Sequence, residues 1–126
     1  NTPTTLNIEN CTFYNSPREG NYLIDYGSDA TLLASVTIKN CIFGLAAKAP
    51  VPPAVAGLGF RVAPSESIIV DGSNYVTSDF YISGIPEASI YNGTSTTLFK
   101  DPAKYDFTII DTGFAGRKTA GDPRWR

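Results

Sequence analysis

The chain contains no histidine, only two cysteines in 126 residues, and no long apolar run. Without histidine, a serine or cysteine nucleophile would lack its usual base, and no Gly-x-Ser-x-Gly motif occurs. Two thiols without an imidazole are also too few ligands for a structural zinc site. No stretch approaches the roughly 20 apolar residues that cross a bilayer. We therefore expect neither a metal centre nor a membrane span.

Charge is also sparse. Charged residues make up 17% of the chain, the net charge is −2, and there is no long basic run. This composition gives no electrostatic footprint for nucleic acid. A hydrophobic content of 42% is ordinary for a folded protein. We expect residues 1–126 to form a single domain, because the length is near the commonest domain size.

One eight-residue pattern recurs four times, as LNIENCTF, VTIKNCIF, IIVDGSNY and FTIIDTGF, starting at residues 6, 36, 68 and 107. Its first and third positions are apolar, which is the alternation of a strand with one buried face. Its fifth position carries residue types that adopt a left-handed backbone at low cost. We expect a corner at each fifth position, which is Asn10, Asn40, Gly72 or Asp111.

Repetition at this period is typical of solenoids, in which each unit buries its apolar face by stacking on its neighbours. Strand, corner and strand in each unit predict an all-β fold, a short single-stranded parallel β-helix of about four coils. Residues 115–126 would form a carboxy-terminal cap. An antiparallel sandwich would also show short strands and turns, but it would not need the same corner type in every copy.

Stacking also predicts columns of similar side chains. The sixth position is small, and Cys11 and Cys41 would lie in neighbouring strands about 4.8 Å apart. Parallel Cβ vectors disfavour a disulfide at this position, so we expect two buried free thiols. The eighth position is aromatic and should form a second column, made of Phe13, Phe43, Tyr75 and Phe114.

The segments between the copies should supply a third strand to each coil, at residues 21–26, 59–62 and 79–83. Residues 46–56, rich in alanine and proline, and residues 84–104 predict longer excursions. Trp125, the only tryptophan, has two interpretations. It is either a hydrophobic lid over the last coil or a ring that stacks on a sugar or a partner.

Catalytic groups are difficult to assemble from this sequence. Glycoside hydrolysis uses two carboxylates, but no Asp-Asp pair occurs, and the Gly-His-Gly of polygalacturonase-type enzymes requires histidine. A polysaccharide lyase would need a basic residue beside acidic groups, often with Ca²⁺, and Asp71 with Arg61 is the best available pair. An Asp-Gly turn explains Asp71 better, and a corner explains Asp111. We expect no catalytic residue and no cofactor, with Ca²⁺ only under the lyase alternative.

Carbohydrate binding has more support, because several of the seven tyrosines lie outside the expected interior columns. Sugar faces stack on aromatic rings while neighbouring polar groups bind hydroxyls. The first candidates are Tyr81 with the nearby Asp79, and Tyr22 and Tyr26, which flank Asp25. The alternative is that these tyrosines are simply favoured in strands.

Several segments together resemble one known family. They are the Asn-Cys-x-Phe corners at Asn10 and Asn40, the runs 74–80 and 98–102, the start of the fourth copy at 106–108, and the closing run 120–125. The chain resembles the carboxy-terminal domain of unknown function that ends pectate-lyase-like, right-handed β-helix proteins of gut Bacteroidetes. The resemblance implies a right-handed helix, a secreted or cell-surface location on the periplasmic or outer-membrane side, and a setting of complex-glycan use. It implies no catalytic residue, because a shared fold does not carry a mechanism.

Residues 1–5 are polar and too short to cover Leu6 and its coil. We expect preceding coils of a longer parent chain, or another chain, to cover it, and an export signal to lie outside this sequence. Our interpretation is a non-catalytic module of a glycan-associated bacterial surface protein that binds polysaccharide. The alternatives are part of a polysaccharide lyase or hydrolase, and a purely structural cap of a longer solenoid.

Overall fold

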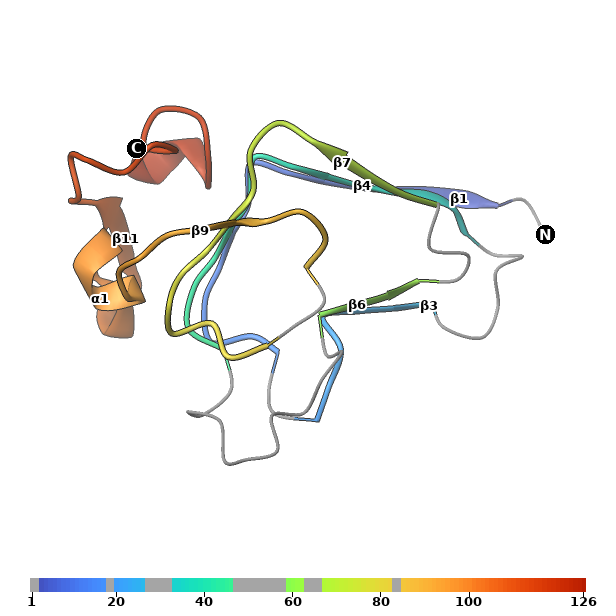
Figure 1. The fold of residues 1–126 in the computed structure, drawn as a ribbon, viewed down its shortest axis with the longest axis horizontal. Helices are drawn as coiled ribbons and strands as arrows, with labels where there is room; N and C mark the ends of the chain where they lie inside the picture. Colours follow the sequence, from blue (N-terminus) through green and yellow to red (C-terminus); the bar gives the residue numbers. More distant parts are fainter. Residues whose placement is uncertain (1–2, 18–19, 27–32, 47–58, 63–66, 83–84) are drawn as a thin grey trace.

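A computed structural model describes residues 3–17, 20–26, 33–46, 59–62, 67–82 and 85–126 (Figure 1). These residues are mostly β, with parallel sheets and one short α-helix. The excursion expected over residues 46–56 lies outside them except for Ala46. No helix in the described ranges is long and apolar enough to cross a membrane.

The first parallel sheet holds the leading strands of the first three sequence copies. Its order is β1 (Thr4–Glu9), β4 (Leu33–Lys39) and β7 (Ile68–Asp71). The register pairs Leu6 with Val36 and Val36 with Ile68. Figure 1 shows the three strands nearly superimposed. The stacking expected for these three copies is therefore confirmed.

Two further parallel sheets continue the coils. The second has the order β2 (Thr12–Phe13), β5 (Ile42–Phe43), β8 (Tyr75–Val76) and β9 (Ser89–Ile90), and the third pairs β3 (Ile24–Tyr26) with β6 (Phe60–Val62). Strands β3 and β6 lie where the third strands of the first two coils were expected. The strand expected over 79–83 is reduced, within the described residues, to one parallel bridge between Ala46 and Phe80.

The corners between the first two sheets use a left-handed backbone, as expected for the first three copies. Asn10, Asn40 and Gly72 have φ values of 52°, 53° and 60°. The Asn40 side-chain oxygen accepts the Ser73 N–H at 3.0 Å, so one corner is bonded to the next. Glycine and asparagine are among the residue types that adopt a left-handed backbone with little strain.

The core lies between the three sheets. Val36, Ile38 and Phe43 are fully buried in it. The Phe13 ring stacks on the Phe43 ring with centroids 4.9 Å apart and planes 4° apart, which confirms the first step of the aromatic column. Large rings held this way stabilise neighbouring coils by burying area and by offset stacking.

Both cysteines are free thiols, as expected. Cys41 is fully buried and its thiol contacts the carbonyl oxygens of Ile8 and Lys39 at 3.4 and 3.3 Å. Burial raises the pKa of the Cys41 thiol to about 11, so it acts as a small core residue. Cys11 is half-buried and not fully buried, because within the described chain no strand pairs with the outer edges of β1 and β2.

The expectation that the aromatic column continues at Tyr75 is wrong. Tyr75 pairs with Ile42, and Val76 lies beside Phe43. The third corner is one residue longer than the second, and Asn74 fills the extra position. Its side-chain oxygen accepts the Cys41 N–H at 2.9 Å. Since successive strand residues face opposite sides, this one-residue shift turns Tyr75 to the outer face of the sheet.

The fourth sequence copy does not form a fourth coil in the first sheet. Its strand, β11 (Asp106–Ile109), pairs antiparallel with β10 (Phe99–Asp101) in a separate two-stranded sheet. Helix α1 (Ser95–Leu98) precedes this hairpin and the 3₁₀ turn η2 (Pro102–Lys104) joins its strands. The fourth layer comes from β9, inside the segment expected to be an excursion. Local sequence could not distinguish these outcomes, because the pattern of β11 fits either strand partner.

The hairpin packs on the outer face of the second sheet, where a second core forms. Fully buried Ile42, Leu98 and Phe99 meet there, with Ile109 and Phe114. Figure 1 shows α1 and β11 beside the coil stack. The strand β5 therefore has two buried faces, with Phe43 in the first core and Ile42 in the second.

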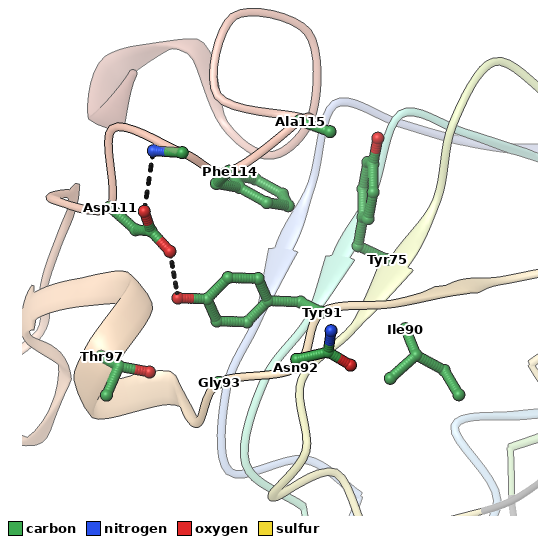
Figure 2. Close-up of a pocket in the computed structure, with 10 residues that line it drawn as sticks. Tyr75, Ile90, Tyr91, Asn92, Gly93, Thr97, Asp111, Phe114 and Ala115 are labelled. Carbon is green, nitrogen blue, oxygen red and sulfur yellow. Dashed lines mark hydrogen bonds between the residues drawn. The ribbon is translucent and has the colours of Figure 1, made fainter.

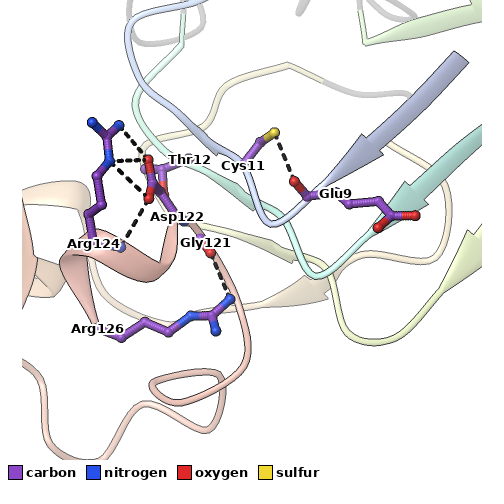
Figure 3. Close-up of polar contacts among 7 residues, drawn as sticks. All are labelled: Glu9, Cys11, Thr12, Gly121, Asp122, Arg124 and Arg126. Carbon is purple, nitrogen blue, oxygen red and sulfur yellow. Dashed lines mark hydrogen bonds and ion pairs between the residues drawn. The ribbon is translucent and has the colours of Figure 1, made fainter.

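The tail after β11 runs back along the corners of the coils (Figure 3). The Gly121 N–H donates to the Asn40 carbonyl at 2.8 Å, and the Asp122 N–H donates to the Thr12 hydroxyl at 3.0 Å. The Arg126 guanidinium donates to the Asn10 side-chain oxygen at 3.1 Å. The cap expected over residues 115–126 thus covers the side of the stack and reaches the first coil.

The position of Trp125 corrects the expectation of a lid over the last coil. It ends the 3₁₀ turn η3 (Pro123–Trp125), and its half-buried ring meets the Phe107 ring edge-on with centroids 6.0 Å apart. The Arg124 guanidinium lies 5.8 Å from the Trp125 ring centre. Trp125 therefore covers β11, because the tail turns back toward the first coil.

Candidate functional site

A groove of about 620 Å³ lies between β9 and the segment that follows β11 (Figure 2). Its wall includes Tyr75, Ile90, Tyr91, Asn92, Asp111 and Phe114. Tyr75 belongs to β8 and Ile90 to β9, and Tyr91 and Asn92 follow β9. Asp111 and Phe114 lie in the segment after β11. The groove exists only where the carboxy-terminal hairpin meets the last coils.

Three rings fix one wall of the groove. Phe114 is buried in the second core, and its ring meets Tyr75 and Tyr91 edge to face, with centroids 4.8 and 5.4 Å apart. Edge-to-face contacts set ring orientation as well as burying area. Tyr75 is available to this wall because the longer third corner turns it outward.

Asp111 lies beside Tyr91 in this wall and is not the left-handed corner expected from the sequence, since its φ is not positive. The Tyr91 hydroxyl donates to its carboxylate at 2.6 Å and the Gly113 N–H donates at 2.8 Å. These two donors, the hydroxyl first, lower the pKa of Asp111 below its ordinary 3.8. Burial and the hydrogen bond to Asp111 raise the pKa of Tyr91. The groove therefore holds a carboxylate beside a neutral phenol at neutral pH.

The rim combines an exposed apolar side chain with an exposed amide. Ile90 is 73% exposed on β9, the last strand of its sheet among the described residues, and Asn92 is exposed near it. Gly93 then passes the Tyr91 ring so closely that a Cβ would lie 2.7 Å from its Cε1 atom. A larger residue would push this ring, so the glycine sets the shape of the groove at this point.

Three of the residues first expected to bind sugar, Tyr22, Asp25 and Tyr26, lie elsewhere, on or next to the third sheet. Arg61 makes two hydrogen bonds to the Asp25 carboxylate, at 2.7 and 2.6 Å, and its guanidinium lies 4.4 Å from the Tyr22 ring centre. Both acceptor atoms of Asp25 and one face of Tyr22 are thereby engaged within the chain. Tyr26 is half-buried and packs against the first core. The charged and aromatic side chains of this face therefore contact one another.

Asp79 is also unsuited to ligand contact, because it is only 9% exposed. One of its oxygens accepts bonds from the Thr77 hydroxyl, the Ser95 N–H and the Ser95 hydroxyl, at 2.6, 2.9 and 3.0 Å. It therefore ties the end of the third coil to the start of α1. Tyr81, at 38% exposure, is the accessible member of that pair.

The structure does not bring together the pair considered for lyase chemistry. Asp71 forms an ion pair with Lys39 at 3.3 Å on the first sheet, whereas Arg61 pairs with Asp25 on the third. The Gly72 N–H and Lys39 lower the pKa of Asp71, and Asp25 raises the pKa of Arg61. The raised pKa makes Arg61 harder to deprotonate and therefore a weaker candidate base. Within the described residues, no three His, Cys, Asp or Glu side chains form a group that could hold a metal ion.

A second depression, of about 540 Å³, includes Thr12, Tyr14, Asn15, Tyr105 and Phe107 in its wall. Tyr105 is 76% exposed and has a left-handed backbone with φ 63°. The Tyr14 ring packs against Phe107 at 5.4 Å. This depression lies between the first coil and the hairpin.

Sequence reasoning missed the groove residues Tyr75, Tyr91 and Asn92. Tyr75 was placed inside by the repeat, and Tyr91 and Asn92 lay in a segment expected to be an excursion. The available signal was a tyrosine directly before the Asn-Gly turn at residues 92–93. That signal does not reveal that Asp111 faces it.

The comparisons with known proteins give a family and no further relative. No curated protein and no solved structure matches the chain. The family described as a domain of unknown function, DUF5123, matches residues 6–125. This match includes all three stacked copies, the groove and the returning tail, and the chain therefore belongs to the DUF5123 family.

Proposed function

We propose that this chain is a non-catalytic polysaccharide-binding module whose ligand lies in the groove between β9 and Asp111. The supporting observation is the groove itself, where fixed aromatic rings and exposed polar groups meet in one concavity. Pyranose rings present apolar CH faces to aromatic side chains and hydroxyls to amides and carboxylates. Tyr75, Tyr91, Asn92 and Asp111 offer both kinds of contact.

The module is proposed to end a longer right-handed parallel β-helix. The support is a difference in burial between equivalent positions of the first two coils. Val36, Ile42 and Phe43 are fully buried, whereas their partners Leu6, Thr12 and Phe13 are half-buried. A further coil stacked on β1 and β2 would bury the second group as β4 and β5 bury the first. The helix is proposed to be right-handed because connections between parallel strands of one sheet are almost always right-handed.

The resemblance noted from the sequence supports a secreted or cell-surface location in Bacteroidetes. In that setting the parent β-helix would present the module to extracellular glycans. The lyase alternative gains no support from the arrangement of Asp71 and Arg61, which have separate partners. The structural-cap alternative shares the fold, so only a ligand measurement separates it from binding.

Affinity electrophoresis through gels that contain neutral or acidic polysaccharides tests the proposal. We expect retardation in at least one gel, and loss of that retardation in Asn92→Ala, because Asn92 is exposed in the groove. The matched control is Tyr81→Ala, which removes an exposed side chain outside the groove. If no polysaccharide slows the migration of the chain, the structural-cap alternative is the one that remains. Loss in Tyr81→Ala but not in Asn92→Ala would move the binding site away from the groove.

A further inference from the structure

The charges around the groove indicate what class of glycan it would take. Asp111 is the one charged residue among the groove's lining residues, and none of those residues is a cation. Elsewhere in the hairpin and the tail, Lys100, Lys104 and Arg124 are paired with Asp106, Asp101 and Asp122. Arg117 and Lys118 follow the groove residue Ala115 in sequence but are not part of the lining.

Asp111 stays ionised in the folded protein, because the Tyr91 hydroxyl and the Gly113 N–H both donate to it. These donors occupy one position on each carboxylate oxygen. Each oxygen keeps a further lone pair, so the carboxylate can still accept a hydrogen bond from a ligand hydroxyl. A ligand carboxylate has no proton to donate at neutral pH and adds a like charge.

The remaining polar groups also suit hydroxyls. Asn92 presents an amide that can donate and accept. Thr97 is part of the lining and donates its hydroxyl proton to the Thr94 carbonyl at 2.8 Å. A ligand rich in hydroxyl groups satisfies these atoms without burying an unpaired charge.

We infer that the groove binds an uncharged, hydroxyl-rich polysaccharide and discriminates against polyuronates. This inference rests on the proposed function and adds the class of ligand to it. A uronate whose carboxylate lies about 4 Å from Asp111 would bind roughly 5-fold to 1,000-fold more weakly than an uncharged sugar, depending on the local dielectric. The apolar part of the wall, the Tyr75 ring, would take the uncharged ring face.

A ligand pair that differs only in charge tests the inference. We would measure binding of the full chain to polygalacturonate and to its fully methyl-esterified form, together with neutral glucans, mannans, galactans and xylans. At low salt we expect neutral polymers to bind and the esterified form to bind at least about fivefold more tightly than the acid form. The difference should shrink as salt is added, because added ions screen the repulsion.

Two variants separate charge from structure. Asp111→Asn removes the charge and should narrow the difference between the two polymers, whereas Tyr91→Phe removes the hydrogen bond, leaves the charge and should keep the difference. If Asp111→Asn does not fold, the salt series on the unaltered chain still tests the charge effect. Equal or tighter binding of the acid form, with or without Ca²⁺, would overturn the inference and leave the proposed function standing. Failure of every polymer to bind would overturn the proposed function itself.

Discussion

The Tyr91 hydroxyl donates a 2.6 Å hydrogen bond to the Asp111 carboxylate in the wall of the groove (Figure 2). Tyr91 follows the last strand of the coil stack, and Asp111 follows the last strand of the antiparallel hairpin. The bond therefore joins the two structural parts of the chain at the place where the groove forms. Because Gly113 holds the same carboxylate from the other side, the geometry of Asp111 is set by both parts.

The stability of this junction should depend on pH. The folded pKa of Asp111 is lowered from 3.8, so its stabilising contribution is fully present above 3.8 and is lost as pH falls through the lower folded value. Tyr91→Phe removes the main cause of the shift. In urea titrations, we expect Tyr91→Phe to have a lower unfolding midpoint than the unaltered chain at pH 7 and a smaller deficit in strong acid. A deficit that does not change with pH would contradict this role of the bond.

The returning tail should require glycine at residue 121. Gly121 has φ 75°, and a Cβ there would lie 2.8 Å from both the Ile42 side chain and the Thr12 hydroxyl. We expect Gly121→Ala to lower the free energy of unfolding by roughly 2–4 kcal/mol, from strain and overpacking together. Gly20→Ala is the matched control, since Gly20 has φ 82° with nothing within 4 Å of the new Cβ. Equal losses in the two variants would mean that the contact with the coils contributes nothing.

The two stacked phenylalanines should differ in their contribution to stability. Phe43 is fully buried and contacts Phe13, Phe60 and Phe80. We expect Phe43→Ala to cost about 3–5 kcal/mol. Phe13→Ala should cost clearly less in this chain, because Phe13 is only half-buried. Chemical denaturation measures both, and a larger loss for Phe13 would contradict the stacking order.

The same pair also tests the proposed parent β-helix. If further coils cover β1 and β2, Phe13→Ala should become as costly as Phe43→Ala in a longer chain that includes them. An unchanged cost in that longer chain would argue against such a coil.

The two thiols should differ in reactivity. Cys41 is fully buried and burial raises its pKa to about 11, whereas Cys11 is half-buried. Since the thiolate is the reactive form, a disulfide reagent such as Ellman's reagent should modify Cys11 first at pH 8. Cys41 should react only as fast as the protein unfolds. Cys11→Ser should therefore abolish the fast phase, and simultaneous reaction of both thiols would contradict the burial of Cys41.

Much of the coil stack can be predicted from local sequence. Asn10, Asn40 and Gly72 are among the few residue types that reverse the chain with a left-handed backbone, and strand alternation places Leu6, Val36 and Ile68 in one column. The family resemblance also anticipated a domain of unknown function. These features follow from the conformational preferences of single residues, which the sequence states directly.

The groove follows from relationships that no short pattern contains. One additional corner residue, Asn74, turns Tyr75 outward, and the fourth copy of the repeat pairs with β10 although its pattern also fits a coil. Asp111 consequently faces Tyr91 in place of turning a corner. The groups expected to bind sugar on the third sheet, Tyr22 and Asp25, instead contact Arg61, since Asp25 and Arg61 lie beside each other in parallel register.

By itself, the sequence determined the strands and corners of the first three copies, the free thiols and the stacked pair Phe13 and Phe43. Only the tertiary structure decided where the fourth copy, Trp125 and Asp111 lie, and hence where a groove exists. The physical reason is that corner and strand preferences are properties of single residues and their neighbours. The choice between stacking as a further coil and packing on the outer face depends on which distant apolar surface is left to bury.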